Sequence, residues 1–296
     1  MQASVYIILL NYNNHGYTIE CIRSLLKISY KNYKIIVVDN GSDEASIDAL
    51  DEWIGEPVIL IKSDINKGFT GGNNIGIKYA LEHEADYVLL LNNDTIVDRF
   101  FLNSLVDTAQ RYNSDAVITS KIYYACEPLK IWYAGGYFNE ITSRCGHVGI
   151  DETDTGQFDK EKEVTFISGC CMCIPRKLLI QVGLLDEGYF IYCEDLDFCC
   201  RVRKSGCRLI YDPKAKIYHK VSATFGKSSF LTVYYTVRNK KYIIEKYITK
   251  KYRYLAKLYD WLETEKRIVT GQYKKEAVKR GVEDHKNNIT GMIVDD

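Results

Sequence analysis

The sequence of 296 residues contains only 4 prolines and 20 glycines, and it has no long apolar run. The low proline and glycine content excludes a collagen-like chain and a long flexible linker. We therefore expect one compact body, with any second module joined to it through packed or helical structure. The longest apolar runs, at 5–10 and 87–91, are far shorter than the roughly 20 residues that span a bilayer. The start also lacks the basic segment and cleavage site of a signal peptide. We therefore expect a cytoplasmic protein with neither a membrane span nor an export signal.

Charge is balanced overall but divided along the chain. Lys and Arg number 39, as do Asp and Glu. Residues 231–296 nevertheless hold 15 basic and 9 acidic residues, which leaves 24 and 30 for residues 1–230. A nucleic-acid-binding protein should carry its basic residues on the body, so we predict no nucleic-acid partner. A basic tail on an acidic body is better suited to an anionic surface.

Ten cysteines are present, and seven of them lie between Cys170 and Cys207. In a chain without an export signal, they are expected to be reduced thiols. A zinc site is one hypothesis for such a cluster, but the spacing lacks the paired C-x2-C pattern of a tetrahedral site. Because reduced cysteine is a common small core residue, core packing is the favoured interpretation.

Short apolar runs alternate with segments of helical period, which is the βαβα pattern of a parallel sheet covered by helices. Strands are predicted at 5–10, 34–38, 58–61, 87–91, 116–118, 164–167, 208–211 and 216–219. Helices are predicted at 15–28, 45–53, 74–83, 99–112, 176–182 and 194–204. Past Phe225 the sequence is helical and rich in tyrosine. The pattern predicts a main domain over 1–225, with halves 1–95 and 96–225, and a tail over 226–296.

Polar residues follow three of the predicted strands at the point where each strand ends. Asn11 follows the first strand, Asp39 the second, and the segment Asn92-Asn93-Asp94 the fourth. Ligands bind at the carboxyl ends of strands in an open α/β sheet, because only these ends face a crevice. Asn and Asp also cap helices and form turns, which would explain any single strand end. Three such ends together favour a shared pocket.

Glycine is concentrated in the segment KGFTGG at 67–72, after the third predicted strand. Glycines there would let backbone N–H groups approach a phosphate at a helix N-terminus. The segment lacks the Gly-Lys-Ser/Thr ending of a P-loop, and it does not follow the first strand as a dinucleotide fingerprint does. It is therefore predicted to be a phosphate-cradling turn, whereas ATPase and NAD-binding functions lose support.

Seven segments stand in unbroken order from Asn11 to Gly226: NYNN, VVDNGSDE, NKGFTGGNNIG, LLNNDT, SGCCMCIPR, GLLDEGYFIYCEDLDFCCRVRKSG and YHKVSATFG. Together they resemble the family 2 glycosyltransferases, in particular the rhamnosyltransferase-like branch that builds polysaccharides. The resemblance implies the GT-A fold of nucleotide-diphospho-sugar transferases, an α/β fold with a mainly parallel mixed sheet flanked by helices. It also implies that 1–95 bind the nucleotide, that 96–225 bind the acceptor, and that 226–296 form a helical appendage.

The resemblance implies a sugar, with rhamnose as one candidate, moved from a nucleoside-diphosphate donor with inversion at the anomeric carbon. A divalent cation, Mn²⁺ or Mg²⁺, suits this reaction because it neutralises the diphosphate leaving group. Asp94 stands where the family places its metal-binding carboxylate and His219 where a further ligand can stand, although a lone histidine is often only a structural hydrogen-bonder. The usual acidic Asp-x-Asp form is broken by Asn92, which is expected to contact the ribose or order the turn. The other residues implied at the donor are Asn11, Asp39, Asn66, Gly68, Gly72 and Asn93.

Asp195, in the segment Glu194-Asp195-Leu196-Asp197, matches the general base of the family. An inverting transfer needs one carboxylate to take the proton of the attacking hydroxyl. A helix is predicted to begin at Glu194, and its positive end should lower the pKa of Asp195. Glu194 is expected to hold acceptor hydroxyls. Asp197 lies four residues before Arg201 and is expected to pair with it on the helix surface.

The implied acceptor is a growing, lipid-linked glycan in surface or capsular polysaccharide synthesis. Trp132 and Gly169 stand where a sugar could stack, although turn and core roles explain them as well. In the tail, tyrosines can pack on the body or on a second copy of the chain, and basic residues can attach to an anionic leaflet. We favour packing for most tyrosines and peripheral contact with the inner face of the cell membrane for some basic residues.

Two alternatives belong to other classes of protein. A catalytically silent module that binds nucleotide sugars or glycans is motivated by the amide of Asn92 in place of an acid. A nucleotidyltransferase on a similar fold would need a glycine-rich basic loop after the first strand, where this sequence has NYNN. The first is the stronger alternative, and donor hydrolysis in the presence of manganese would separate it from an enzyme.

Overall fold

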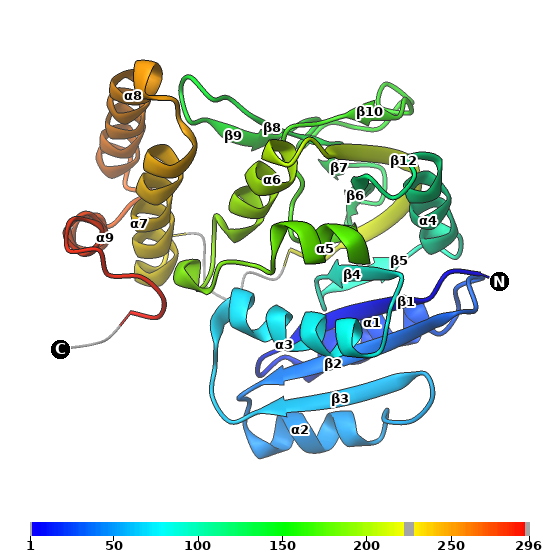
Figure 1. Cartoon of the computed structure of the whole chain (residues 1–296). Coiled ribbons are helices and arrows are strands. Elements are labelled where there is room, and N and C mark those ends of the chain that lie inside the picture. The colour runs from blue at the N-terminus through cyan, green and yellow to red at the C-terminus, as the bar shows by residue number, and fades with distance from the viewer. Residues whose placement is uncertain (1, 222–227, 294–296) are drawn as a thin grey trace.

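The computed structural model describes residues 2–221 and 228–293, which Figure 1 shows as helices and strands. A mixed sheet of strand order β10-β12-β6-β11-β4-β1-β2-β3 forms its centre. The first half of the sheet is parallel and consists of β1 (Val5–Asn11), β2 (Tyr33–Asn40), β3 (Val58–Ser63) and β4 (Tyr87–Leu91). Apolar side chains fill β1, β2 and β4, as expected for central strands of a sheet covered by helices.

Antiparallel strands enter in the second half. Strand β11 (Cys171–Pro175) runs antiparallel to β4 on one side and to β6 (Ala116–Tyr124) on the other. Strand β12 (Arg208–His219) is parallel to β6 and antiparallel to β5 (Thr95–Val97) and β10 (Lys162–Glu163). The short strands are β7 (Ile131–Tyr133), β8 (Gly136–Phe138) and β9 (Cys145–His147). The predicted mixed sheet is confirmed.

Helices flank the sheet (Figure 1). In the body they are α1 (His15–Leu25), α2 (Glu44–Asp51), α3 (Gly68–Glu82), α4 (Phe101–Arg111), α5 (Arg176–Val182), the 3-10 turn η1 (Glu187–Tyr189) and α6 (Glu194–Lys204). Helix α2 begins where the side chain of Asp43 accepts a 2.8 Å hydrogen bond from the backbone N–H of Ser46. Helix α6 has acids in its first turn and bases in its last, which matches the helix dipole.

Helix α3 begins earlier than predicted, because the expected glycine-rich turn is the first turn of the helix. A Cβ added to Gly72 would lie 2.3 Å from Cδ1 of Leu10, and one added to Gly76 would lie 2.7 Å from Cγ2 of Ile8. These glycines therefore let α3 approach β1 closely. The sequence pattern does not distinguish this packing role from a turn.

The strand predictions for the second half were partly wrong. Residues 164–167 follow β10 and form only an isolated bridge, between Gly136 and Phe166. The segment Cys171–Pro175 was not predicted as a strand, because its sequence CMCIP carries few of the β-branched residues that mark strands. The two strands predicted at 208–211 and 216–219 are one strand, β12, with a register shift between Asp212 and Lys216.

Within residues 228–293, the C-terminal part consists of three helices: α7 (Phe230–Tyr247), α8 (Lys250–Val269) and α9 (Lys275–Lys286). They gather beside α6 at one end of the molecule (Figure 1). Ile244 and Tyr247 of α7 join the main core, whereas Tyr234 and Tyr235 pack against α9 in a smaller cluster. The boundary predicted between residues 225 and 226 falls outside the described residues.

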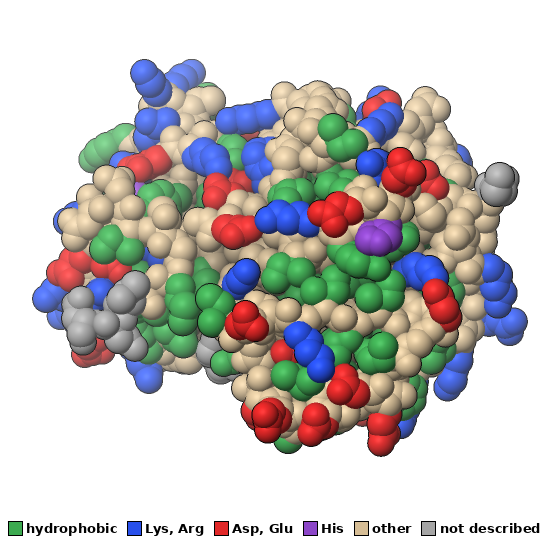
Figure 2. Space-filling view, turned by 60° about the horizontal axis from the view of Figure 1, so that its bottom comes forward, with side chains coloured by type: hydrophobic (Ala, Val, Ile, Leu, Met, Phe, Trp, Pro, Cys, Tyr) green, Lys and Arg blue, Asp and Glu red, His purple; other side chains and the backbone are tan. Residues whose placement is uncertain are grey.

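Acidic and basic side chains gather at different places on the surface. In Figure 2, acidic side chains lie along the lower edge of the molecule. Lys and Arg are prominent at the upper left, the end that carries the C-terminal helices in Figure 1. Within residues 2–221 and 228–293, every helix is too short or too polar to cross a membrane.

Candidate active site

A cavity of about 490 Å³ opens at the carboxyl ends of β1 and β4, between the first turns of α3 and α6. Most of the residues predicted for the site line it: Asn66, Gly68, Asn92, Asn93, Asp94, Glu194, Asp195 and His219. They come from distant parts of the chain and meet because several strands end at the same edge of the sheet. The cavity is within the size range of small-molecule sites.

Asn11, Asp39 and Gly72 are not among the residues that line the cavity. Asn11 and Asp39 are fully buried, and the Asn11 Nδ2 donates a 2.8 Å hydrogen bond to Oδ2 of Asp39. The other carboxylate oxygen, Oδ1, accepts a 3.0 Å bond from the backbone N–H of Ser42. Both oxygens of Asp39 thus have protein partners, and Gly72 packs on β1. Direct contacts of these three residues with a donor stay predictions.

Asp94 and His219 are brought together by the pairing of β5 with β12. The Nε2 atom of His219 lies 3.0 Å from Oδ1 of Asp94, and both side chains are 7% exposed. Nδ1 of His219 has no hydrogen-bond partner among the described residues. Two ligand atoms held at right angles about 2.1 Å from an octahedral cation would be about 3.0 Å apart. The pair therefore fits a divalent cation.

Two protein ligands do not complete a metal site by themselves. Across the described ranges, no group of three or more His, Cys, Asp or Glu side chains is placed to hold a metal ion. Mg²⁺ and similar cations are often bound through one or two carboxylates, with substrate phosphates and water filling the remaining positions. A pair of ligands at the wall of an open cavity therefore matches a cation shared with a phosphorylated substrate better than a closed structural site.

Asn92 and Asn93 hold the turn after β4. The backbone N–H of Asn92 donates a 2.9 Å bond to the carbonyl of Cys170, and its Nδ2 lies 3.5 Å from Nε2 of His219. The Nδ2 of Asn93 donates a 2.8 Å bond to the hydroxyl of Thr18. Neither contact of Asn92 tests the two functions expected of its side chain, ordering the turn and contacting a ribose, and both stay predictions.

The first turn of α3 forms another wall of the cavity through Asn66 and Gly68. The N–H of Gly68 donates a 2.8 Å bond to Oδ1 of Asn66, and the N–H of Thr70 donates a 3.2 Å bond to the carbonyl of Phe190. Two N–H groups of this turn are therefore bonded within the protein. The phosphate-binding capacity predicted for the segment is correspondingly reduced.

Glu194 and Asp195 open α6 and face the cavity. Burial raises the pKa of Asp195 to about 6, although backbone N–H groups of Gly169 and Leu196 bond its oxygens at 3.1 and 2.8 Å and act in the opposite direction. The sequence led us to expect a lowered pKa, but burial outweighs the helix end. Burial, with the adjacent Asp195 carboxylate, raises the pKa of Glu194 well above its usual range. The two adjacent carboxyl groups therefore both hold their protons to higher pH than isolated carboxyl groups do.

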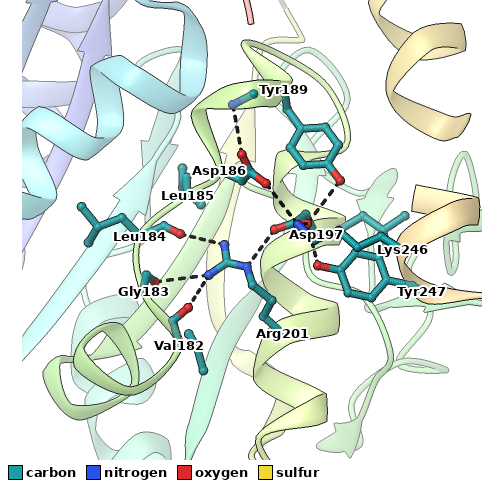
Figure 3. A network of polar contacts seen from close by, with 12 residues as sticks. Val182, Gly183, Leu184, Leu185, Asp186, Tyr189, Asp197, Arg201, Lys246 and Tyr247 are labelled. Atoms are coloured by element: carbon teal, nitrogen blue, oxygen red, sulfur yellow. Dashed lines mark hydrogen bonds and ion pairs between the residues drawn. The ribbon is translucent and has the colours of Figure 1, made fainter. Parts of the chain in front are cut away.

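Asp197 lies in a network of hydrogen bonds and ion pairs, which Figure 3 shows. Its Oδ2 accepts a 2.8 Å bond from Nε of Arg201, which confirms the predicted pair, although Asp197 is fully buried and not on the helix surface as predicted. Its Oδ1 accepts 2.6 Å bonds from Lys246 and Tyr247 of α7. Burial alone would raise the pKa of Asp197, but these partners outweigh burial and hold the pKa below its usual value. Arg201 also donates to the carbonyls of Val182, Gly183 and Leu184. The network fastens α6 to α7 and to the end of α5.

The segment that leads into Glu194 has an unusual backbone. Phe190, Tyr192 and Cys193 have φ angles of 60°, 67° and 71°, a region that costs non-glycine residues about 1–3 kcal/mol each. The buried Nδ2 of Asn239 in α7 donates to the carbonyls of Tyr189, Ile191 and Tyr192 at 2.9, 2.8 and 2.8 Å. This contact holds the strained segment in place. The Tyr-rich sequence around 234–259 did not reveal that α7 supports the cavity wall.

Sequence analysis missed His147, which lines the cavity next to Trp132. The rings of Trp132 and His147 meet edge to face with centroids 4.5 Å apart, and Trp132 meets His219 at the same distance. Burial lowers the pKa of His147 to about 4, so its imidazole is neutral at pH 7. Residue 147 falls in a polar stretch without periodicity, and only the β8–β9 hairpin places it at the cavity.

The sequence is similar to those of two named transferases. A hexosyltransferase of low-salt glycan biosynthesis from Haloferax volcanii, Agl10, is 28% identical over 248 residues, covering 81% of this chain and 75% of the relative. The dTDP-rhamnosyl transferase RfbF of Shigella flexneri is 24% identical over 254 residues, covering 83% and 81%.

Solved structures share the fold. The crystal structure of GalNAc-T7 with UDP, GalNAc and Mn²⁺ superposes with a TM-score of 0.65 at 16% identity, covering 82% of this chain. The chain spans about half of that structure, 48% of its length. At this identity the likeness concerns the fold alone, and with the mixed sheet it supports the predicted GT-A fold. The model of the family described as Glycosyl transferase family 2 matches residues 6–183, more than half of the sequence. The chain therefore belongs to glycosyl transferase family 2.

Proposed function

We propose that this protein transfers a sugar, with inversion, from a nucleoside-diphosphate donor to a hydroxyl of a growing, lipid-linked glycan. One observation carries the proposal: a single cavity is lined both by the Asp94–His219 pair and by the Glu194–Asp195 pair. The first pair suits a diphosphate with its cation, and the second suits a hydroxyl that must lose its proton. In the proposed transfer, the diphosphate must leave and the hydroxyl must attack at the same anomeric carbon.

Asp94 and His219 would hold the cation at the donor diphosphate. When bound, Mn²⁺ or Mg²⁺ supplies positive charge to the leaving group as the bond to the sugar breaks. The described part of the chain offers two ligands, so the donor itself would complete the coordination. Asn66, Gly68 and Asn93 line the same cavity and would contact the nucleotide.

Asp195 would act as the general base. With a pKa of about 6 it is mostly ionised at pH 7, yet basic enough to accept the proton of the attacking hydroxyl. Burial and the adjacent Asp195 carboxylate raise the pKa of Glu194 well above its usual range, which disfavours an ionised Glu194 in this role. Oε2 of Glu194 is buried and has no hydrogen-bond partner in the described residues, which leaves it available to hold an acceptor hydroxyl. Trp132 and His147 would form an apolar surface for a sugar ring.

Donor and acceptor are proposed from the named relatives. We propose rhamnose carried on deoxythymidine diphosphate, because the relative from Shigella flexneri is a dTDP-rhamnosyl transferase by name. The Haloferax relative is named for glycan biosynthesis, which supports a glycan acceptor in polysaccharide synthesis. The proposal places the reaction in the cytoplasm, at the inner face of the membrane where lipid-linked acceptors lie.

The test is substitution of the two adjacent carboxyl groups. Asp195→Asn keeps the shape and removes the proton acceptor, so transfer should fall about 10²- to 10⁴-fold while donor binding in manganese stays near the parental affinity. Glu194→Gln should raise the acceptor KM more than it lowers kcat. Asp115→Asn, at an exposed aspartate far from the cavity, is the matched control. Near-parental transfer by Asp195→Asn, or loss of turnover only in Glu194→Gln, would refute the assignment.

A further inference from the structure

Helix α8 has an exposed apolar face. Tyr254, Trp261 and Leu262 are 82%, 55% and 50% exposed, and Leu255, Leu258 and Tyr259 are exposed beside them. Their spacing of three and four residues puts them on one side of a helix of 20 residues. An exposed cluster of this kind, with two tyrosines and a tryptophan, marks an interaction surface rather than chance exposure. We call these six residues the α8 face.

The charges of α8 are divided between its two sides. The buried carboxylate of Asp260 faces α7, where it lies 3.2 Å from Nζ of Lys240 and 3.1 Å from Nζ of Lys241. Glu263 also points inward, with Oε2 at 3.2 Å from Lys240. The acids are thus neutralised against α7, and within α8 only Glu265 remains as an exposed acid. The exposed lysines of the helix are Lys250, Lys251, Lys257 and Lys266.

We propose that the α8 face docks this protein on the interface of an anionic lipid bilayer. An interfacial helix combines an apolar side that includes Trp and Tyr with Lys and Arg at its polar borders. The apolar side enters the boundary between headgroups and acyl chains, and the lysines are attracted by the surface potential of anionic lipids. About 30 Å of helix would lie in the plane of the membrane.

A second copy of the chain is a less suitable occupant of the α8 face. A two-fold symmetric dimer brings the same patch of each subunit together. Here that would bring the exposed lysines of two copies of α8 together. Lys257 is paired with Glu245 of its own chain, and one exposed glutamate on each helix would remain to compensate the other three lysines. An anionic bilayer is complementary to both the charge and the aromatic content of the surface. Because α8 also packs on α7, docking would hold the cavity wall that Asn239 supports at a fixed place relative to the membrane.

The experiment is co-sedimentation of the full chain with vesicles of phosphatidylcholine containing 30% phosphatidylglycerol, compared with pure phosphatidylcholine. The parent should sediment with the anionic vesicles and be released as salt rises. The variant Leu258→Ser, Trp261→Ser, Leu262→Ser should lose at least tenfold in partition. Lys251→Gln with Lys266→Gln should lose about tenfold on anionic vesicles. Matched controls are the triple variant Ile65→Ser, Leu129→Ser, Ile180→Ser, at body positions that are even more exposed, and Lys31→Gln with Lys78→Gln.

Unchanged circular dichroism and melting temperature would show that the variants are folded, as expected for exposed positions. Bromine-labelled lipid should quench the fluorescence of the parent, and Trp261→Phe should remove this quenching. Binding that the α8 substitutions leave unchanged, quenching that survives Trp261→Phe, or no preference for anionic vesicles would overturn the proposal. The proposal would also be overturned if sedimentation velocity showed a dimer that the triple variant abolishes while its vesicle binding persists. None of these measurements depends on the proposed sugar transfer.

Discussion

Asn239→Ala tests whether α7 holds the site. The substitution removes the donor to three carbonyls of the segment 189–192, of which Tyr189 O keeps a 3.3 Å bond from Arg238. Ile191 O and Tyr192 O lose the 2.8 Å bonds from Nδ2. An unsatisfied buried carbonyl costs about 1–3 kcal/mol, and Ile191 and Tyr192 are half-buried, so the gross cost is about 2–3 kcal/mol.

The strained backbone of this segment changes the expected result. Phe190, Tyr192 and Cys193 have positive φ, and relaxing even one of them returns about 1–3 kcal/mol. We therefore expect the segment to move, with a net loss in the free energy of unfolding of at most about 2 kcal/mol. Because Cys193 directly precedes Glu194, this movement displaces Asp195. A shift of about 1 Å in a catalytic group can cost about 100-fold, so kcat should fall at least tenfold with donor affinity retained.

Urea unfolding and steady-state transfer kinetics measure the two effects separately. Ile243→Ala is the matched control, because it lies on the same helix, is fully buried in the core, and should cost about 2–5 kcal/mol without removing a side-chain hydrogen bond to the segment. The control should be less stable than Asn239→Ala but more active. If Asn239→Ala keeps the parental kcat, or if Ile243→Ala loses as much kcat at a temperature where both are folded, the positioning role of Asn239 is wrong.

Three further predictions concern metal, pH and stability. Asp94→Ala should fold normally but lose manganese-dependent donor binding in calorimetry. His219→Ala should lose part of the activity and regain it at higher manganese. Full activity of Asp94→Ala in chelator would contradict a cation held by Asp94 and His219. Because Asp195 must be ionised to act, kcat should fall about tenfold per pH unit below its pKa of about 6, and a flat profile between pH 5 and 7 would exclude it as the base. Lys246→Met should lower the free energy of unfolding by about 1–2 kcal/mol at pH 7. Because the pKa of Asp197 is lowered in the folded state, this loss should disappear as falling pH protonates Asp197. A loss that does not change with pH in urea unfolding would show that the ion pair contributes nothing.

The fold and the strand-end site could be predicted from the sequence because both depend on local pattern. The buried runs of β1, β2 and β4 are continuous, and polar residues follow them directly. The Asp197–Arg201 pair was predicted because helical spacing alone places the two side chains together. The short strand β11 was missed because its cysteines and methionine carry little strand preference, and its position between β4 and β6 decides its conformation.

Other features depend on contacts between distant segments. Asn239 reaches Ile191 across 48 residues of sequence, and His147 reaches Trp132 through a hairpin, so no local pattern reveals either. The direction of the pKa shift of Asp195 was predicted wrongly for the same reason. The helix end is visible in the sequence, whereas the burial that outweighs it comes from the whole cavity.

The most direct test of the account is proton NMR of the reaction of the purified protein with dTDP-rhamnose, manganese and a glycan acceptor. The account predicts a product whose anomeric configuration is opposite to that of the donor, formed by the parent and reduced at least 100-fold in Asp195→Asn. A product that retains the donor configuration, or equal product formation by Asp195→Asn, would contradict the inverting mechanism with Asp195 as its base.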